Sequence, residues 1–252
     1  MKRSLFCAAV LMFVLNLTNF TQAAPVGDPA DPVLLIGAYP VKAEGIADFL
    51  FGRDFDLSGA NTEIKGQWYF GKVSISPIEK IDVYGLIGTA DLKIDNWTTN
   101  DYTLETDRAL AWGGGATILL YETEEYGDGI LRVSLSGNYR DYDPGVETVK
   151  KSGADISGVI KREFRYREWQ GSLGISYTLP ALTPYFGVKY SDCECKLEID
   201  DHGTIHKTRA NSKDIVGAFV GVDYLFTENA ALNLEGRFID ETALNVGMKI
   251  NF

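Results

Sequence analysis

The segment from 244 to 252 alternates strictly between apolar and polar or small residues. Leu244, Val246, Met248, Ile250 and Phe252 take every second position. Neighbouring side chains of a β-strand point to opposite faces of the sheet, so this period of two predicts a strand with one apolar face. Soluble sheets and membrane barrels both use such strands, so the number of repeats matters more than any single one.

The same period of two recurs over most of the sequence beyond residue 44. On these segments apolar side chains share one face, whereas Arg, Glu, Lys, Asn and Ser are frequent on the other. The pattern predicts ten strands, at 46–57, 63–76, 81–94, 107–121, 130–142, 164–179, 184–197, 214–226, 230–240 and 243–252.

Three features favour a membrane barrel over a soluble periplasmic sandwich. The segments have the length of tilted membrane-crossing strands, aromatic residues gather near strand ends, and short links alternate with long ones. We therefore predict an all-β fold: a closed antiparallel up-and-down transmembrane β-barrel of about ten strands. In the first strand Arg53 interrupts the apolar face, and eight strands is the alternative if that segment lies outside the barrel.

The first 44 residues differ from the rest. Lys2 and Arg3 precede an uncharged, largely apolar run, and Thr21-Gln22-Ala23 ends it with small residues at its first and third positions. This layout predicts a cleaved signal peptide at 1–23 and hence export. Four of the eight prolines fall within 24–44, which predicts an extended periplasmic arm, with the barrel over 45–252.

Composition narrows the function. The sequence has 24 Lys and Arg against 35 Asp and Glu, a net charge of −11, so a nucleic-acid partner is excluded, because phosphate binding requires a basic surplus. A glycine-rich phosphate loop is missing, since Gly113-Gly114-Gly115 lies inside a predicted strand, and we expect no cofactor.

An alternating final strand that ends on an aromatic residue, together with a signal peptide, resembles the small outer-membrane β-barrels of Gram-negative bacteria, of the opacity-type and OmpA-like class. The resemblance implies residence in the cell outer membrane, contact with its lipid, and insertion by the outer-membrane barrel assembly machinery. It also implies that Leu244, Val246, Met248, Ile250 and Phe252 form the assembly signal. The segment 24–32 is similar to the beginning of the chlamydial major outer-membrane proteins.

The polar face of the strands would line the interior of the barrel. A barrel of eight to ten strands is narrow enough for side chains to fill, so opposite charges should pair there. We expect a structural, surface-recognition or adhesion protein with a filled lumen; a small-solute or ion channel is the alternative. The predicted polar network of the lumen consists of Arg132, Arg140, Glu168, Glu235, Arg237 and Lys249.

The long polar links at 95–106, 143–163 and 198–213 are expected to be outer loops that could bind an extracellular ligand. We expect no enzymatic activity and no metal. A distant alternative is an omptin-like protease at the rim, with candidate residues Asp141, Asp143, Asp200, Asp201 and His202. Another alternative is a metal site formed by His202, His206, Cys193 and Cys195, and the two cysteines are expected either as free thiols or in an intermolecular disulfide.

Overall fold

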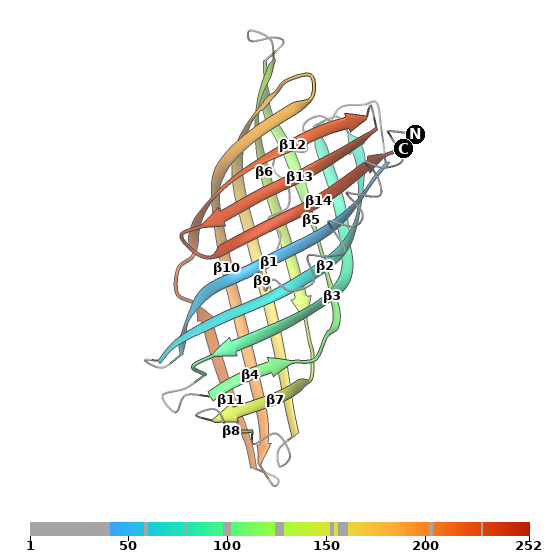
Figure 1. The fold of residues 1–252 in the computed structure, drawn as a ribbon. Coiled ribbons are helices and arrows are strands. Elements are labelled where there is room, and N and C mark those ends of the chain that lie inside the picture. Colours follow the sequence, from blue (N-terminus) through green and yellow to red (C-terminus); the bar gives the residue numbers. More distant parts are fainter. Residues whose placement is uncertain are drawn as a thin grey trace.

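The computed structural model describes residues 41–57, 60–78, 80–97, 102–123, 129–151, 154–155, 161–201, 204–227 and 229–252 (Figure 1). Within these ranges the ordered elements are strands, and none of the described residues forms a helix long and apolar enough to cross a membrane. The strands are β1 (Val41–Leu57), β2 (Ala60–Ile78), β3 (Ile81–Asp95), β4 (Tyr102–Thr106), β5 (Ala109–Glu122), β6 (Ile130–Tyr142), β7 (Val146–Lys151), β8 (Ala154–Asp155), β9 (Lys161–Thr178), β10 (Leu182–Asp201), β11 (Thr204–Ser212), β12 (Val216–Thr227), β13 (Ala230–Phe238) and β14 (Thr242–Asn251).

Ten of these strands close into an antiparallel ring in the order β1–β2–β3–β5–β6–β9–β10–β12–β13–β14. β14 returns to β1, with Lys42 opposite Asn251 at one end of the pair and Gly52 opposite Thr242 at the other. Closure leaves no free edge in the ring, so its backbone N–H and C=O groups are paired without water. The predicted closed ten-stranded barrel is confirmed, and the eight-stranded alternative is wrong.

β1 explains why the sequence pattern broke at Arg53. The register of β1 against both neighbours shifts between Leu50 and the residues at 52–53, which is a β-bulge. The extra residue changes which face the following side chains occupy, so Arg53, Phe55 and Leu57 are buried inside the barrel. β1 starts at Val41, so 41–44 of the predicted arm is strand, whereas the predicted signal peptide and 24–40 lie outside the described residues.

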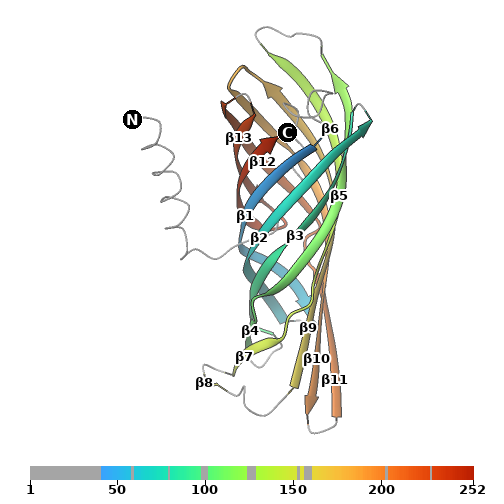
Figure 2. The same cartoon turned by 90° about the vertical axis from the view of Figure 1, so that its right-hand side faces the viewer.

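The three segments predicted as long polar loops are wrong in part, because they contain further strands. β4 pairs with β3 and β7, β7 also pairs with β8, and β11 pairs with β10 and β1. These segments have alternating residues of their own, such as Leu104 and Thr106, that pack into the barrel. They extend the wall beyond the end of β6 and β12, as Figure 2 shows.

The outward face of the long strands changes character partway along. On β10, Phe186, Val188 and Tyr190 are exposed, and the next outward residues are Asp192 and Glu194. Apolar exposure on one side of this change and charge on the other mark the edge of the hydrocarbon layer. We call the apolar-faced part, which includes the N-terminal end of β1 and the C-terminal end of β14, the membrane tier, and the charged-faced part the distal tier.

Strand lengths agree with this division. β13 and β14 have 9 and 10 residues, close to the number that crosses hydrocarbon, whereas β9 and β10 have 18 and 20. The links after β2, β9 and β12 are short and lie at the end where Phe252 N donates to Val41 O. The long excursions that contain β4, β7, β8 and β11 leave from the opposite end. Because the longer connections of such barrels are usually extracellular, we expect the distal tier to be extracellular.

The lipid-facing wall yields a stability prediction. Val220 is 50% exposed on the outward face of β12 in the membrane tier. Val220→Arg should lower the free energy of unfolding in lipid vesicles by about 2–4 kcal/mol, because the charge must leave water for hydrocarbon. The matched control is Asp56→Arg, an outward position of the distal tier, which should change it by less than about 0.5 kcal/mol. Urea titration followed by heat-modifiable electrophoretic mobility measures both, and equal losses would contradict the assignment of the two tiers.

Candidate functional site in the lumen

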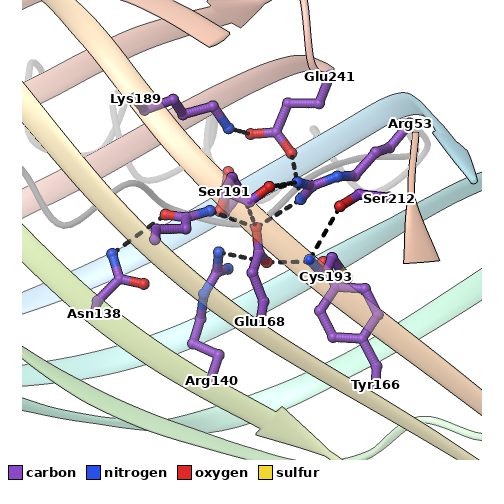
Figure 3. Close-up of polar contacts among 12 residues, drawn as sticks. Arg53, Asn138, Arg140, Tyr166, Glu168, Lys189, Ser191, Cys193, Ser212 and Glu241 are labelled. Carbon is purple, nitrogen blue, oxygen red and sulfur yellow. Dashed lines mark hydrogen bonds and ion pairs between the residues drawn. The ribbon is translucent and has the colours of Figure 1, made fainter. Parts of the chain in front are cut away.

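Eight charged side chains meet inside the barrel where the two tiers join, and Figure 3 labels five of them: Arg53, Arg140, Glu168, Lys189 and Glu241. We call them the central ion cluster. Ion pairs connect all of them, and each of the eight side chains is at most 1% exposed. The members are Asp48, Arg53, Arg140, Glu168, Lys189, Arg237, Asp240 and Glu241.

Glu168 on β9 is the centre of one half of the cluster. Its two carboxylate oxygens lie 2.6 Å from Arg53 Nη1 and 2.8 Å from Arg140 Nη2. Three neutral groups also donate to it: Tyr166 Oη at 2.8 Å, Gln170 Nε2 at 2.6 Å and Ser191 Oγ at 2.6 Å. A carboxylate removed from water needs this many donors, because an unpaired buried charge costs several kcal/mol.

The turn between β13 and β14 supplies the other half. Asp240 lies 2.8 Å from Lys189 Nζ, and Glu241 contacts Lys189 and Arg237, the latter at 3.2 Å. Arg237 also donates to Asp48. Both acidic side chains point inward although they are adjacent, which the backbone permits because Ile239 adopts a positive φ of 88°.

Gly217 on β12 makes room for this turn. A Cβ at this position would lie 1.9 Å from Asp240 Oδ1 and 2.9 Å from Lys189 Cε. A side chain here would push Asp240 and Lys189 aside and disturb their ion pair, which favours glycine at this position.

An apolar cluster fills the lumen on the distal side of the ions. It includes Trp68, whose ring lies 5.4 Å from that of Tyr142 and 5.3 Å from that of Tyr166. Arg140 stacks over Trp68 at 5.5 Å and joins the two clusters. The interior was expected to be hydrophilic throughout; that expectation is wrong for the distal tier, where the outside faces water and the apolar residues must therefore turn inward. Buried members include Phe55, Ile64, Leu92, Ile94, Trp97, Leu104, Val149, Phe164, Cys193, Cys195 and Leu197.

On the periplasmic side of the central ion cluster the inward groups form separate pairs. Lys72 lies 2.9 Å from Glu44, Lys249 lies 3.2 Å from Asp223, and Lys42 pairs with Asp82. Tyr185 and Asn233 link Glu235 to Asp223 by hydrogen bonds. Charged side chains thus pair along the whole length of the membrane tier.

The six predicted lumen residues are all buried, but the structure does not bring them together. Arg140 and Glu168 form one ion pair and Arg237 lies 3.8 Å from Glu235, whereas Arg132 pairs with Glu122 and Lys249 with Asp223. The six predicted residues leave out five members of the central ion cluster: Asp48, Arg53, Lys189, Asp240 and Glu241. Arg53 could have been found from the sequence, since it interrupts an apolar face. Asp240 and Glu241 lie in a turn and follow no strand period, so no sequence pattern indicates them.

The remaining candidate residues, for the assembly signal, a protease and a metal site, do not form one common site. The proposed assembly-signal residues Leu244, Val246, Met248, Ile250 and Phe252 lie on the outward face of the last strand and its end. Asp141 accepts from Arg167 at 3.0 Å, and Asp143 accepts from Arg165. His202 lies outside the described residues. Cys193 and Cys195 are free and buried, and the described part of the chain contains no group of three or more His, Cys, Asp or Glu arranged for a metal.

Removal of the Glu168 carboxylate should lower the free energy of unfolding. Glu168→Gln keeps the shape but leaves Arg53 and Arg140 with a neutral partner, so the free energy of unfolding should fall by about 3–5 kcal/mol. Asp91→Asn, which breaks the partly exposed pair with Arg108, should cost at most about 1 kcal/mol. Urea unfolding in lipid vesicles compares the two variants; equal losses would show that the central ion cluster is not a stabilising core.

The sequence is similar to those of chlamydial outer-membrane proteins. The family model described as Chlamydia major outer membrane protein matches residues 148–205, from β7 to the start of β11. The major outer membrane porin of Chlamydia trachomatis serovar B is 26% identical over 214 residues, which cover 59% of this chain and 53% of the relative. The serovar A porin is 24% identical over 226 residues, covering 63% and 56%. The chain spans about half the length of the curated relatives it matches.

Solved structures with a similar backbone include the translocator domain of autotransporter NalP from Neisseria meningitidis, at 11% identity and a TM-score of 0.49, covering 88% of this chain and 92% of that one. The outer membrane protease OmpT from Escherichia coli gives 11% identity and a TM-score of 0.48, covering 87% and 100%. The closed ring, its apolar exterior and the matches to outer-membrane porins lead to one conclusion: this chain is a β-barrel protein of the bacterial outer membrane.

Proposed function

We propose that the protein is a filled outer-membrane barrel whose interior is structural and whose distal tier serves in surface recognition. The observation that supports this proposal is the filling of the lumen by two stacked layers. Arg53, Arg140 and Glu168 are 0–1% exposed in the ionic layer, and Trp68 and Phe164 are 0% exposed in the apolar layer. A ring of ten strands is narrow enough for side chains to occupy its cross-section.

The distal tier suits recognition because it is a rigid wall that carries connections. Its outer surface is covered by partly exposed ion pairs, among them Arg108–Asp91 and Lys207–Glu198. The residues of 95–106, 143–163 and 198–213 that lie between the strands are the candidate binding loops, because contacts with ligands concentrate on loops held by a rigid scaffold.

Shortening one distal hairpin tests the recognition role. Replacement of the segment between Glu198 and Lys207 by a two-residue turn should lower binding of nanodisc-embedded protein to immobilised glycans and matrix proteins by about tenfold. The matched control shortens the opposite, periplasmic turn between Glu122 and Ile130 and should leave binding unchanged. Equal binding by both variants and the wild type would refute the proposal.

A second candidate is a narrow gated channel, favoured by the strained turn between β13 and β14. A β-branched residue such as Ile239 at positive φ costs about 1–3 kcal/mol, and the ion pairs of Asp240 and Glu241 hold the turn in place. Release of those pairs would let the strained turn move out of the lumen. The curated relatives are named porins, which agrees with this candidate.

Planar-bilayer recordings distinguish the two candidates. For a gated channel, Asp240→Asn with Glu241→Gln should raise the open probability, because the inward turn loses its ionic partners, and Ile239→Gly should lower it, because glycine relieves the strain. Lys80→Gly, which relieves a positive φ of 75° at a periplasmic turn, is the control and should have no effect. If the double variant gives no more conductance steps than the wild type, the channel candidate is wrong.

A further inference from the structure

We propose that β11 binds an extended acidic peptide of a partner protein, which adds a strand to the margin of the distal tier. The proposal deepens the recognition role, on which it rests, because it names the class of partner and the surface that binds it. The partner is defined by its chemistry: a segment that can form a β-strand and carries acidic residues at alternate positions.

β11 lies at the margin of a three-stranded sheet. Figure 2 shows β9, β10 and β11 extending together past the ends of β1 and β2. β11 pairs with β10 over residues 204–211, whereas its pairing with β1 covers only Asn211 and Ser212. In the register of that pairing, the last residue of β1, Leu57, is level with Ala210. Within the described residues, 204–209 therefore have a strand on one side only, and we call this stretch the free edge.

The alternation of hydrogen bonds along β11 shows which backbone groups the free edge presents. Lys213 N donates to Asp54 O at 3.0 Å, so the backbone of Lys213 points toward β1. In an antiparallel strand every second residue points the same way, so Ile205, Lys207 and Arg209 direct their N–H and C=O groups away from β10. These residues offer three donors and three acceptors to a further strand, over about 20 Å of extended chain.

The free edge lacks features that commonly protect the margin of a sheet. Its register with β10 continues without a bulge, and it contains no proline. Regular edges of this kind pair readily with another extended chain. The opposite margin of the same sheet is covered, because Phe164 N donates to Pro144 O at 3.4 Å and Gly145 forms a bridge with Glu163. In the described part of the chain, the β11 margin is thus the one suited to an added strand.

The outward side chains of the free edge select the charge of the added strand. Lys207 and Arg209 are 71% and 60% exposed, and their present partners, Glu198 and Glu194, both lie on β10. An added strand would approach from the other side, with Cβ atoms about 4.5–5.5 Å from those directly opposite, where opposite charges stabilise the pair. Lys and Arg each have several N–H donors, so both can accept a second carboxylate without releasing the first.

The same cations disfavour a second copy of this chain as the occupant. Residues 204–212 include Lys207 and Arg209 and no acidic residue. Two copies joined through their free edges would therefore bring four cations together with no carboxylate on either edge strand. Like charges at this separation destabilise a sheet, whereas an acidic strand is attracted to the same edge.

Peptide binding to nanodisc-embedded protein tests the proposal. The probe is a fluorescently labelled peptide of sequence Thr-Val-Glu-Val-Glu-Val-Thr, and fluorescence anisotropy measures its affinity. Ile205→Pro removes an N–H of the free edge without removing a hydrogen bond to β10, so it should weaken binding by about tenfold. Lys207→Gln should weaken binding by about threefold. The matched control, Lys196→Gln, removes an outward cation of β10 and should leave binding unchanged.

Altered peptides separate the role of the backbone from that of the charge. One peptide is N-methylated at its Val residues and another at its Glu residues; one of the two should lose binding, because only one set of N–H groups faces the free edge. A peptide with Lys in place of Glu should bind about tenfold more weakly. Equal binding by both methylated peptides, by the Lys peptide, or by an Ile205→Pro variant that remains heat-modifiable would overturn the proposal.

The result can be distinguished from a failure of the recognition role itself. If the wild type binds glycans or matrix proteins but not the acidic peptide, the strand-addition proposal is wrong and the recognition role stands. If it binds none of these ligands, both are wrong. Light scattering of the nanodiscs is the last measurement: self-association that Ile205→Pro abolishes would show that a second copy occupies the free edge, which would also overturn the proposal.

Discussion

The requirement that every backbone polar group in hydrocarbon be paired within the sheet governs this molecule. An open sheet would expose unpaired N–H and C=O groups to lipid at several kcal/mol each, so the strands must form a ring. The β14–β1 seam meets this requirement over a register that runs from Lys42 to Gly52 with one bulge. Ring closure gives a lumen narrow enough for side chains to fill. It also gives an outer surface that must be apolar in lipid and polar in water.

The two tiers show how one strand is adapted to lipid over part of its length and to water over the rest. On β10 the outward face changes from Val188 and Tyr190 to Asp192 and Glu194, while the inward face changes from Lys189 and Ser191 to Cys193 and Cys195. The period of two continues without interruption, but the apolar residues change from the outward face to the inward face. The central ion cluster lies at the level where the apolar residues change from the outward to the inward face. It therefore lies between the lipid-facing membrane tier and the apolar interior of the distal tier.

Strand positions were predictable because alternation is a local property. The ten predicted barrel strands agree with the structure to within a few residues at most ends, and Arg53 marked the bulge without revealing its geometry. The distal tier was not predictable in the same way, because apolar-in and apolar-out strands have the same period. Asp240 and Glu241 depend on a turn conformation at Ile239 that β-branched residues rarely adopt, so no residue preference signals it.

The seam between β1 and β14 joins residues about as far apart along the described chain as its length allows. Native contacts of such sequence separation form late, because the entropy of closing the loop must be overcome first. Until Thr242–Asn251 arrive, β1 and β13 each present a bare edge to whatever surrounds them. Exposed strand edges of this kind favour aggregation, so the chain is most prone to aggregate in the interval before its last strand pairs.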